Sequence, residues 1–357
     1  MIVSGADRQS ERIGAMPLIK ILMPATRWPL ARQTPHGSAC WGDYTFAINN
    51  DVDECDACVV LDALPGVERC ICPPERVFYL GLEPPIQTSF HERFLAQFAT
   101  VVTCGGHHIA HPRHIESFPL QPWYFGIDMS SSCTLAKQSR YWTFEQVAAL
   151  QPKKTKLLSV VCSEKRHTPG HRKRYEFTKA LKEHFGDRLD WFGTGVNPLA
   201  DKAQALVDYK YHVAIENSSV PHYWTEKLAD PYLGWALPIY WGCPNVTEYF
   251  PADSLVGIDL DDLPGAIKTI EHLIEASAWE SSLEAIREGR RRVLEQYNLF
   301  PMIIRLVEQT AAGPRAKIVL RPHAHFVGRM RYLLRRTRAR LQFGWGVTKV
   351  FRFLGKI

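Results

Sequence analysis

The chain has 357 residues, of which 46% are hydrophobic and 22% are charged, a composition typical of globular proteins. Its formal net charge of +6 comes from one end, because residues 315–357 contain twelve Lys and Arg and no Asp or Glu, whereas residues 1–314 contain 31 basic and 37 acidic residues. This balance argues against nucleic-acid binding by the body, and no apolar run approaches the roughly 20 residues of a membrane-spanning helix.

The first part of the chain alternates short apolar runs with polar, helix-compatible stretches. Residues 1–15 are polar and predicted to be disordered, and the apolar run Met16–Ala25 is interrupted by Lys20, which favours a strand over a signal peptide. We predict strands at Ile19–Met23, Ala57–Leu61, Val77–Leu80 and Thr100–Cys104, and a helix at Glu92–Phe98. Continuous apolar strands that alternate with helices indicate a parallel sheet covered on both faces, so residues 16–150 are predicted to form an α/β domain.

A second alternating set follows the polar residues 134–155, which we interpret as a linker zone. The predicted strands are Leu157–Cys162, Leu189–Phe192, Tyr211–Ile215, Leu237–Trp241 and Leu255–Ile258, and the predicted helices are Arg172–Phe185, Leu199–Asp208, Thr225–Trp235, Leu263–Ser277 and Trp279–Tyr297. Doubly wound sheets bind ligands at the carboxyl ends of their strands. We therefore expect a second α/β domain over residues 151–314 and a site in the cleft between two Rossmann-like domains.

A polar stretch, ENSSVPHYWTEKL (216–228), joins the strand Tyr211–Ile215 to the next helix. Thr225 is a good N-cap, so Glu226 and Lys227 fall in the first helical turn. A helix N-terminus presents free N–H groups and a partial positive charge, to which Lys227 adds a full charge. The stretch therefore suits a phosphate group.

Uncharged hydrogen-bonding groups lie close to this helix start. Asn217 and Tyr223 supply an amide and a phenol, and Glu226 is placed to accept from sugar or ribose hydroxyls. Together these groups suit a diphosphate that carries a sugar. The alternative is an ordinary helix start, in which Glu226 complements the helix dipole and Lys227 is solvated.

Residues 209–259 read YKYHVAIENSSVPHYWTEKLADPYLGWALPIYWGCPNVTEYFPADSLVGID. This stretch resembles the C-terminal signature of glycosyltransferase family 10, the α1,3/4-fucosyltransferases of bacterial type, with its internal spacing kept over about fifty residues. Weaker resemblance covers roughly residues 18–300, including RVFYLGLEPP (76–85) and HPRHI (111–115). The resemblance supports a GT-B-like α/β fold, in which two Rossmann-like doubly wound domains face each other across a cleft.

The resemblance implies roles for five residues of the second domain. Lys227 and Arg174 match the cations that hold the diphosphate of GDP-fucose, and guanidinium suits bidentate phosphate contact. Glu226, Tyr223 and Asn217 match residues that contact the sugar, ribose or phosphates of the donor.

Glu83, in LEPP, matches the acid of the family's Glu-Ser-Pro-like segment, whose implied role is that of the general base. Since the family makes an α link from GDP-β-L-fucose, the reaction inverts, and Glu83 would take the proton of the acceptor hydroxyl. No metal or other cofactor is then required. Pro84 replaces the family's Ser, which puts the shape of the acceptor side in doubt. The alternative for Glu83 is a solvated loop carboxylate.

Several other clusters have the composition of metal sites, but each has a simpler interpretation. The acids flank strands or cap helices, the cysteine run lacks the usual second two-residue gap of a zinc site, and the histidines form a loop. These clusters are Asp51 with Asp53, Asp259 with Asp261 and Asp262, Cys55 and Cys58 with Cys70 and Cys72, and His107 with His108, His111 and His114.

The basic end, residues 315–357, alternates Arg and Lys with apolar and aromatic residues, as interfacial helices do. We predict an amphipathic tail that binds an anionic membrane, the alternative being a solvated basic tail. Nine cysteines, several within apolar runs, favour a reducing compartment and hence the cytoplasm, with the protein on the inner face of the membrane.

The sequence therefore predicts a transferase of L-fucose from GDP-fucose to a glycan, possible acceptors being lipid-linked precursors of bacterial surface polysaccharide. The rivals are transfer of another nucleotide sugar, a catalytically inactive nucleotide-sugar or glycan-binding protein, and a membrane-bound interaction protein that acts through its tail.

Overall fold

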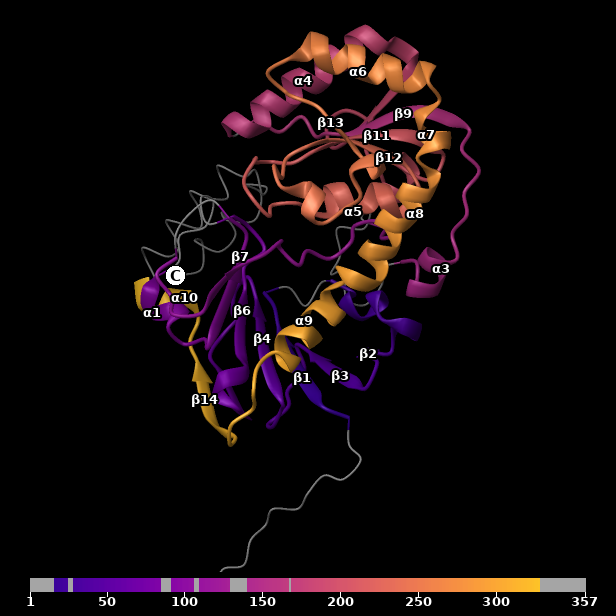
Figure 1. The fold of residues 1–357 in the computed structure, drawn as a ribbon. Coiled ribbons are helices and arrows are strands. Elements are labelled where there is room, and N and C mark those ends of the chain that lie inside the picture. The colour runs from indigo at the N-terminus through magenta and orange to yellow at the C-terminus, as the bar shows by residue number, and fades with distance from the viewer. Residues whose placement is uncertain are drawn as a thin grey trace, which may run out of the picture.

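The computed structural model describes residues 16–24, 28–84, 91–105, 109–128, 140–166 and 168–327. These residues form two α/β domains, the first in the lower and the second in the upper half of Figure 1.

The first domain is built on a seven-stranded sheet with the order β2-β3-β1-β4-β6-β7-β8, parallel except for the pairing of β2 with β3. β4 (ACVVL) is apolar along its whole length and fully buried, as expected for an inner strand covered on both faces. The strands are β1 (Leu18–Leu22), β2 (Cys40–Trp41), β3 (Tyr44–Ile48), β4 (Ala57–Leu61), β6 (Val77–Leu80), β7 (Thr100–Thr103) and β8 (His114–Glu116), and short helices are η1 (Leu30–Gln33), η2 (Pro35–Gly37), η3 (Pro74–Arg76) and α1 (Glu92–Leu95).

The second domain is built on a parallel five-stranded sheet with the order β10-β9-β11-β12-β13. Helices α4 and α6 lie on one side of this sheet and α5 and α8 on the other (Figure 1). Its elements are β9 (Lys156–Val161), α4 (Pro169–Phe185), η4 (Gly186–Arg188), β10 (Leu189–Phe192), η5 (Lys202–Ala205), β11 (Tyr209–Ile215), α5 (Glu226–Leu233), β12 (Leu237–Trp241), η6 (Val246–Glu248), η7 (Ala252–Ser254), β13 (Val256–Gly257), α6 (Leu263–Glu275), α7 (Ala278–Ser281) and α8 (Leu283–Arg291).

The predicted class of two doubly wound α/β domains is confirmed by this topology. In chain order the second sheet reads 2-1-3-4-5, so its strand order reverses between β9 and β11. The parallel strands of the first sheet have the same order, with the reversal between β1 and β4. Ligands of such sheets bind beside the reversal, at the carboxyl ends of the strands.

Two predicted helices differ from the structure. Residues 199–208 were expected to form an α-helix, but only the 3-10 turn η5 forms, because Asp201 and Gln204 close a capping box around it and the chain enters β11 soon after. The single helix expected at Trp279–Tyr297 is divided at Ser282 into α7 and α8 and ends in the π-helix η8 (Arg292–Gln296). Within the expected linker zone, α3 (Phe144–Ala148) begins at a capping box closed by Thr143.

The chain returns to the first domain after η8. In α9 (Leu299–Glu308), Phe300 packs edge-on against Phe46 with ring centroids 4.7 Å apart. β14 (Ala316–Leu320) then pairs antiparallel with β5 (Glu68–Cys72), and α10 (His323–Val327) lies beside α1 (Figure 1). The sequence prediction had grouped residues up to 314 with the second domain and the rest with a tail, whereas α9, β14 and α10 lie on the first domain.

The remainder of the predicted tail, residues 328–357, and the predicted disordered residues 1–15 lie outside the described residues. Within the described part of the chain, no helix is both long and apolar enough to cross a membrane.

Candidate active site

Two loops of the second domain meet where the strand order of its sheet reverses. Residues 162–168 lead from β9 into α4, and residues 216–225 lead from β11 into α5. Gly170, in the first turn of α4, lies so close to the second loop that a Cβ atom there would be 2.6 Å from the Asn217 carbonyl oxygen. The absence of a side chain at this position thus lets the N-terminus of α4 approach the end of β11.

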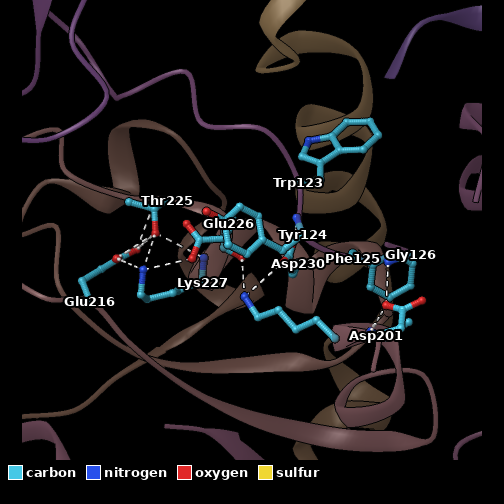
Figure 2. Close-up of polar contacts among 12 residues, drawn as sticks. Trp123, Tyr124, Phe125, Gly126, Asp201, Glu216, Thr225, Glu226, Lys227 and Asp230 are labelled. Atoms are coloured by element: carbon cyan, nitrogen blue, oxygen red, sulfur yellow. Dashed lines mark hydrogen bonds and ion pairs between the residues drawn. The ribbon is translucent and has the colours of Figure 1, made fainter. Parts of the chain in front are cut away.

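The carboxylate of Glu216 organises the start of α5. It is buried and accepts hydrogen bonds from the backbone N–H of Thr225 (2.8 Å) and from the Thr225 hydroxyl (2.8 Å to Oε2). Its Oε2 lies 3.7 Å from Nζ of Lys227, which also contacts Oε1 of Glu226 at 3.0 Å (Figure 2). Two carboxylates therefore hold the Lys227 ammonium group at the first turn of the helix.

Glu226 and Lys227 are both charged in this environment. Burial opposes ionisation of Glu226, but the positive charges of Lys227 and Lys202 outweigh it and bring the pKa of the Glu226 carboxyl down to about 2. For Lys227, burial is opposed by Glu226 and Glu216, and the pKa of the ammonium group is raised. Glu226 is thus a permanent hydrogen-bond acceptor.

Arg174 adds its positive charge to the field around Lys227, and Lys165 in turn lies in the field of Arg174. Arg174, buried on α4, donates from Nη1 to Oδ1 of Asn217 at 2.7 Å, and its Nε has no hydrogen-bond partner among the described residues. Burial and the positive charge of Arg174 together lower the pKa of Lys165, in the loop after β9. Within the described part of the chain, neither Arg174 nor Lys165 has an acidic partner in an ion pair. Two positive charges at the reversal point therefore remain available to an anion.

Glu83 approaches the same place from the first domain. It follows β6, and its Oε2 accepts a hydrogen bond from the Tyr223 hydroxyl at 3.2 Å. Burial raises the pKa of the Glu83 carboxyl to about 7, with Lys227 opposing and Glu226 adding to the shift. A second contact between the domains joins the Gly105 N–H to the Pro221 carbonyl at 2.9 Å. A carboxyl group of this pKa suits general base catalysis near neutral pH.

The structure thus brings the six residues singled out from the sequence into one neighbourhood, namely Glu83, Arg174, Asn217, Tyr223, Glu226 and Lys227. Sequence reasoning did not include Lys165 or Glu216 among them. Glu216 directly follows a buried strand, and an acid at the carboxyl end of such a strand is a feature that could have identified it. Lys165 lies in an ordinary polar run, SEKR, which carries no comparable signal.

None of the alternative metal clusters gains support. Among the described residues, no group of three or more His, Cys, Asp or Glu side chains is arranged to hold a metal ion. The four cysteines weighed as zinc ligands lie buried in a hydrophobic core of the first domain. His107 and His108 lie outside the described residues, and Asp261 pairs with Lys173 at 2.5 Å.

Residues 151–281 match the family model described as glycosyltransferase family 10 (fucosyltransferase) C-term. An alpha-(1,3)-fucosyltransferase FucT of Helicobacter pylori is 36% identical over 74 residues, which are 20% of this chain and 16% of the relative. Alpha-(1,3)-fucosyltransferase B of Drosophila melanogaster is 34% identical over 68 residues, 19% and 15% of the two chains. The matched segment is therefore less than a fifth of either relative's length.

Solved structures with a related arrangement have low similarity. An alpha1,3-fucosyltransferase with GDP is 19% identical, with a TM-score of 0.44 over 82% of this chain and 94% of that chain. A UDP-forming trehalose-phosphate synthase from Burkholderia xenovorans is 8% identical, with a TM-score of 0.44 over 71% and 73%. These values carry no conclusion about fold or function, for which we rely on the topology and on the family match.

The family match covers the half of the site that lies in the second domain, including Arg174 and the whole stretch 216–228, whereas Glu83 lies outside it. Residues 151–281 thus resemble the C-terminal domain of glycosyltransferase family 10, the fucosyltransferases.

Proposed function

We propose that the protein is an inverting fucosyltransferase that moves L-fucose from GDP-β-L-fucose to a hydroxyl group of a glycan. The observation that carries this proposal is the cluster of Arg174, Lys165 and Lys227 beside the N-termini of α4 and α5. A nucleoside diphosphate supplies adjacent negative charges that match such a cluster, and guanidinium and backbone N–H groups bind phosphate oxygens well. The fucosyltransferase family of residues 151–281 supports fucose as the sugar.

The geometry supports a single displacement. Glu83 takes the proton of the acceptor hydroxyl while the acceptor oxygen forms a bond to the anomeric carbon of the sugar. The bond from that carbon to the diphosphate oxygen breaks on the opposite face, and its electron pair leaves with GDP. Arg174, Lys165 and Lys227 stabilise the charge that develops on the diphosphate. A base in this role contributes ~10²–10⁴-fold to the rate.

The proposal predicts that Arg174→Ala loses affinity for GDP. A charge-assisted hydrogen bond is worth about 1.5–3 kcal/mol, so the Kd measured by calorimetry should rise roughly 10- to 100-fold. Arg172→Ala is the matched control, because Arg172 lies on the same helix with an exposed side chain. Equal protection of the wild type from thermal unfolding by UDP and GDP would contradict the guanine donor, and no response to either would contradict donor binding altogether.

The acceptor and the location form a second part of the proposal. Residues 328–357 contain nine Lys and Arg and no Asp or Glu, interleaved with apolar and aromatic residues. Each Lys or Arg near an anionic leaflet contributes about 1 kcal/mol. We therefore propose that this segment binds the inner face of the cytoplasmic membrane, where a lipid-linked glycan would serve as the acceptor.

A further inference from the structure

A segment of the first domain, Trp123–Gly126, lies against the second domain beside the proposed donor site. The backbone N–H of Tyr124 donates to Oδ1 of Asp230 at 3.2 Å, and that of Gly126 donates to Oδ1 of Asp201 at 2.9 Å (Figure 2). From the first domain, Nη2 of Arg32 donates to the carbonyl oxygens of Trp123 (2.7 Å) and Phe125 (2.9 Å). The segment is therefore fixed on both edges, by two carboxylates and by one guanidinium group.

Asp230 connects this segment to the start of α5. It is fully buried and lies one helical turn after Glu226. Nζ of Lys202 is 2.8 Å from Oδ2 of Asp230 and donates to the backbone carbonyl of Glu226 at 3.3 Å. A buried carboxylate is costly unless it is paired, and here both of its oxygens face partners. The Asp230–Lys202 ion pair therefore contacts both the backbone of Tyr124, through Asp230, and the backbone of Glu226, through Lys202.

The hydrogen bonds that fix this segment all use its backbone atoms, so the side chain of Tyr124 takes no part in them. Its ring packs on Trp28, with centroids 4.7 Å apart, and lies beside Glu226 in Figure 2. Among the described residues, its hydroxyl has no hydrogen-bond partner.

Burial and then the negative charges of Glu226, Glu83 and Asp230 raise the pKa of the Tyr124 phenol. The hydroxyl is therefore a neutral donor in the field of the two carboxylates that the proposed reaction uses. Both of these carboxylates are assigned to the sugar end of the donor, Glu226 as an acceptor of hydroxyl groups and Glu83 as the base.

We propose that the Tyr124 hydroxyl contacts the sugar of the nucleotide-sugar donor and that Asp230 is a positioning residue that holds it beside Glu226. This inference rests on the proposed function, because it takes the ligand of Arg174 and Lys227 to be a nucleotide sugar. It adds a residue of the first domain to a donor site whose other proposed contacts all lie within residues 151–281, the range that matches the family model.

The test compares GDP-fucose with GDP, since only the first carries the sugar. Tyr124→Phe keeps the ring on Trp28 and removes one hydrogen bond worth about 0.5–1.5 kcal/mol, so the Kd for GDP-fucose should rise about 2- to 12-fold while that for GDP is unchanged. Tyr141→Phe is the control, because Tyr141 is an exposed tyrosine of the first domain (45%). Equal losses for both ligands, or no loss for either, would overturn the assignment to the sugar.

Asp230→Asn tests the positioning role. Asn retains an acceptor for the Tyr124 N–H and loses the charge that faces Lys202, so it should reproduce the selective loss for GDP-fucose. The double variant with Tyr124→Phe should lose less than the sum of the single changes, because the two act on one contact. Additive losses would overturn the positioning role, and if Asp230→Asn does not fold, Tyr124→Phe still decides the contact. A wild type that binds neither GDP nor GDP-fucose would instead refute the proposed function, and this inference with it.

Discussion

Two carboxylates of the proposed site differ in charge state because they differ in partners. Glu226 contacts the Lys227 ammonium at 3.0 Å, and the pKa of its carboxyl falls to about 2. Glu83 is partly buried and accepts a hydrogen bond from the neutral phenol of Tyr223, and burial raises the pKa of its carboxyl to about 7. Environments that separate the pKa values of neighbouring acids commonly separate their roles. Glu83 is suited to proton transfer and Glu226 to binding as a permanent anion.

The raised pKa of Glu83 predicts the pH dependence of turnover. The base form is the ionised one, so kcat/KM for GDP-fucose should increase with pH and reach half of its plateau near pH 7. Glu83→Gln should lower kcat by about 10²–10⁴-fold and remove this acid limb, while GDP binding is retained. Glu116→Gln, an exposed acid of the first domain, is the control. An acid limb that persists in Glu83→Gln would assign the titration to another group.

Some residues of the proposed site can be identified from the sequence immediately around them, whereas others are recognised only once the fold brings them together. Glu226 and Lys227 follow an N-cap in a spaced motif, so one stretch of sequence indicates them. Asp230 lies within the signature stretch 209–259 but has no assigned role there, and Tyr124 and Lys165 belong to two other segments of the chain. Their roles depend on which loops the topology brings together, and a single sequence does not contain that information.

At the scale of elements, long inner strands were predictable and short or edge elements were not. β4 is a continuous apolar run and β11 ends in one, Val213–Ile215, and the burial of both strands leaves few alternatives. β5 and β14 form an antiparallel pair of partly exposed strands from opposite ends of the chain, which local periodicity does not reveal. The short η5 was predicted as a full helix because its apolar residues also fit helical spacing.

The start of α5 gives a prediction at this scale. Thr225→Ala removes the N-cap and leaves the buried carboxylate of Glu216 without one of its donors, the Thr225 hydroxyl, which contacts both carboxylate oxygens. The free energy of unfolding in urea should fall by about 1–3 kcal/mol, and GDP should bind more weakly because Lys227 loses its support. Thr225→Ser retains the hydroxyl and serves as the control. Equal stability of the two variants would show that the cap hydroxyl does not stabilise the helix start.

For the molecule as a whole, the C-terminal part of the described chain, from α9 to α10, lies on the first domain. Arg315 lies 3.4 Å from Glu54 and also contacts Asp56, both in the first domain, and Leu320 on β14 is buried in its core. Charge counting assigned these residues to a basic tail because it does not distinguish a Lys or Arg beside a paired strand from one in a solvent-exposed segment. The described structure therefore extends to Val327, thirteen residues beyond residue 314, where charge had placed the end of the second domain.

Two truncations separate the structural role of this part from the proposed membrane role. A chain ending at Val327 keeps β14 and α10, so its Tm should equal that of the full chain, while its sedimentation with vesicles of anionic lipid should be lost. A chain ending at Arg315 also exposes β5 and Leu320, and burial of one such leucine alone stabilises by about 1.5–3 kcal/mol, so its Tm should fall as well. Vesicles of uncharged phosphatidylcholine are the control for both chains. The chain that ends at Val327 lacks residues 328–357. If it still bound anionic vesicles, membrane attachment would lie elsewhere and the proposed role of residues 328–357 would be refuted.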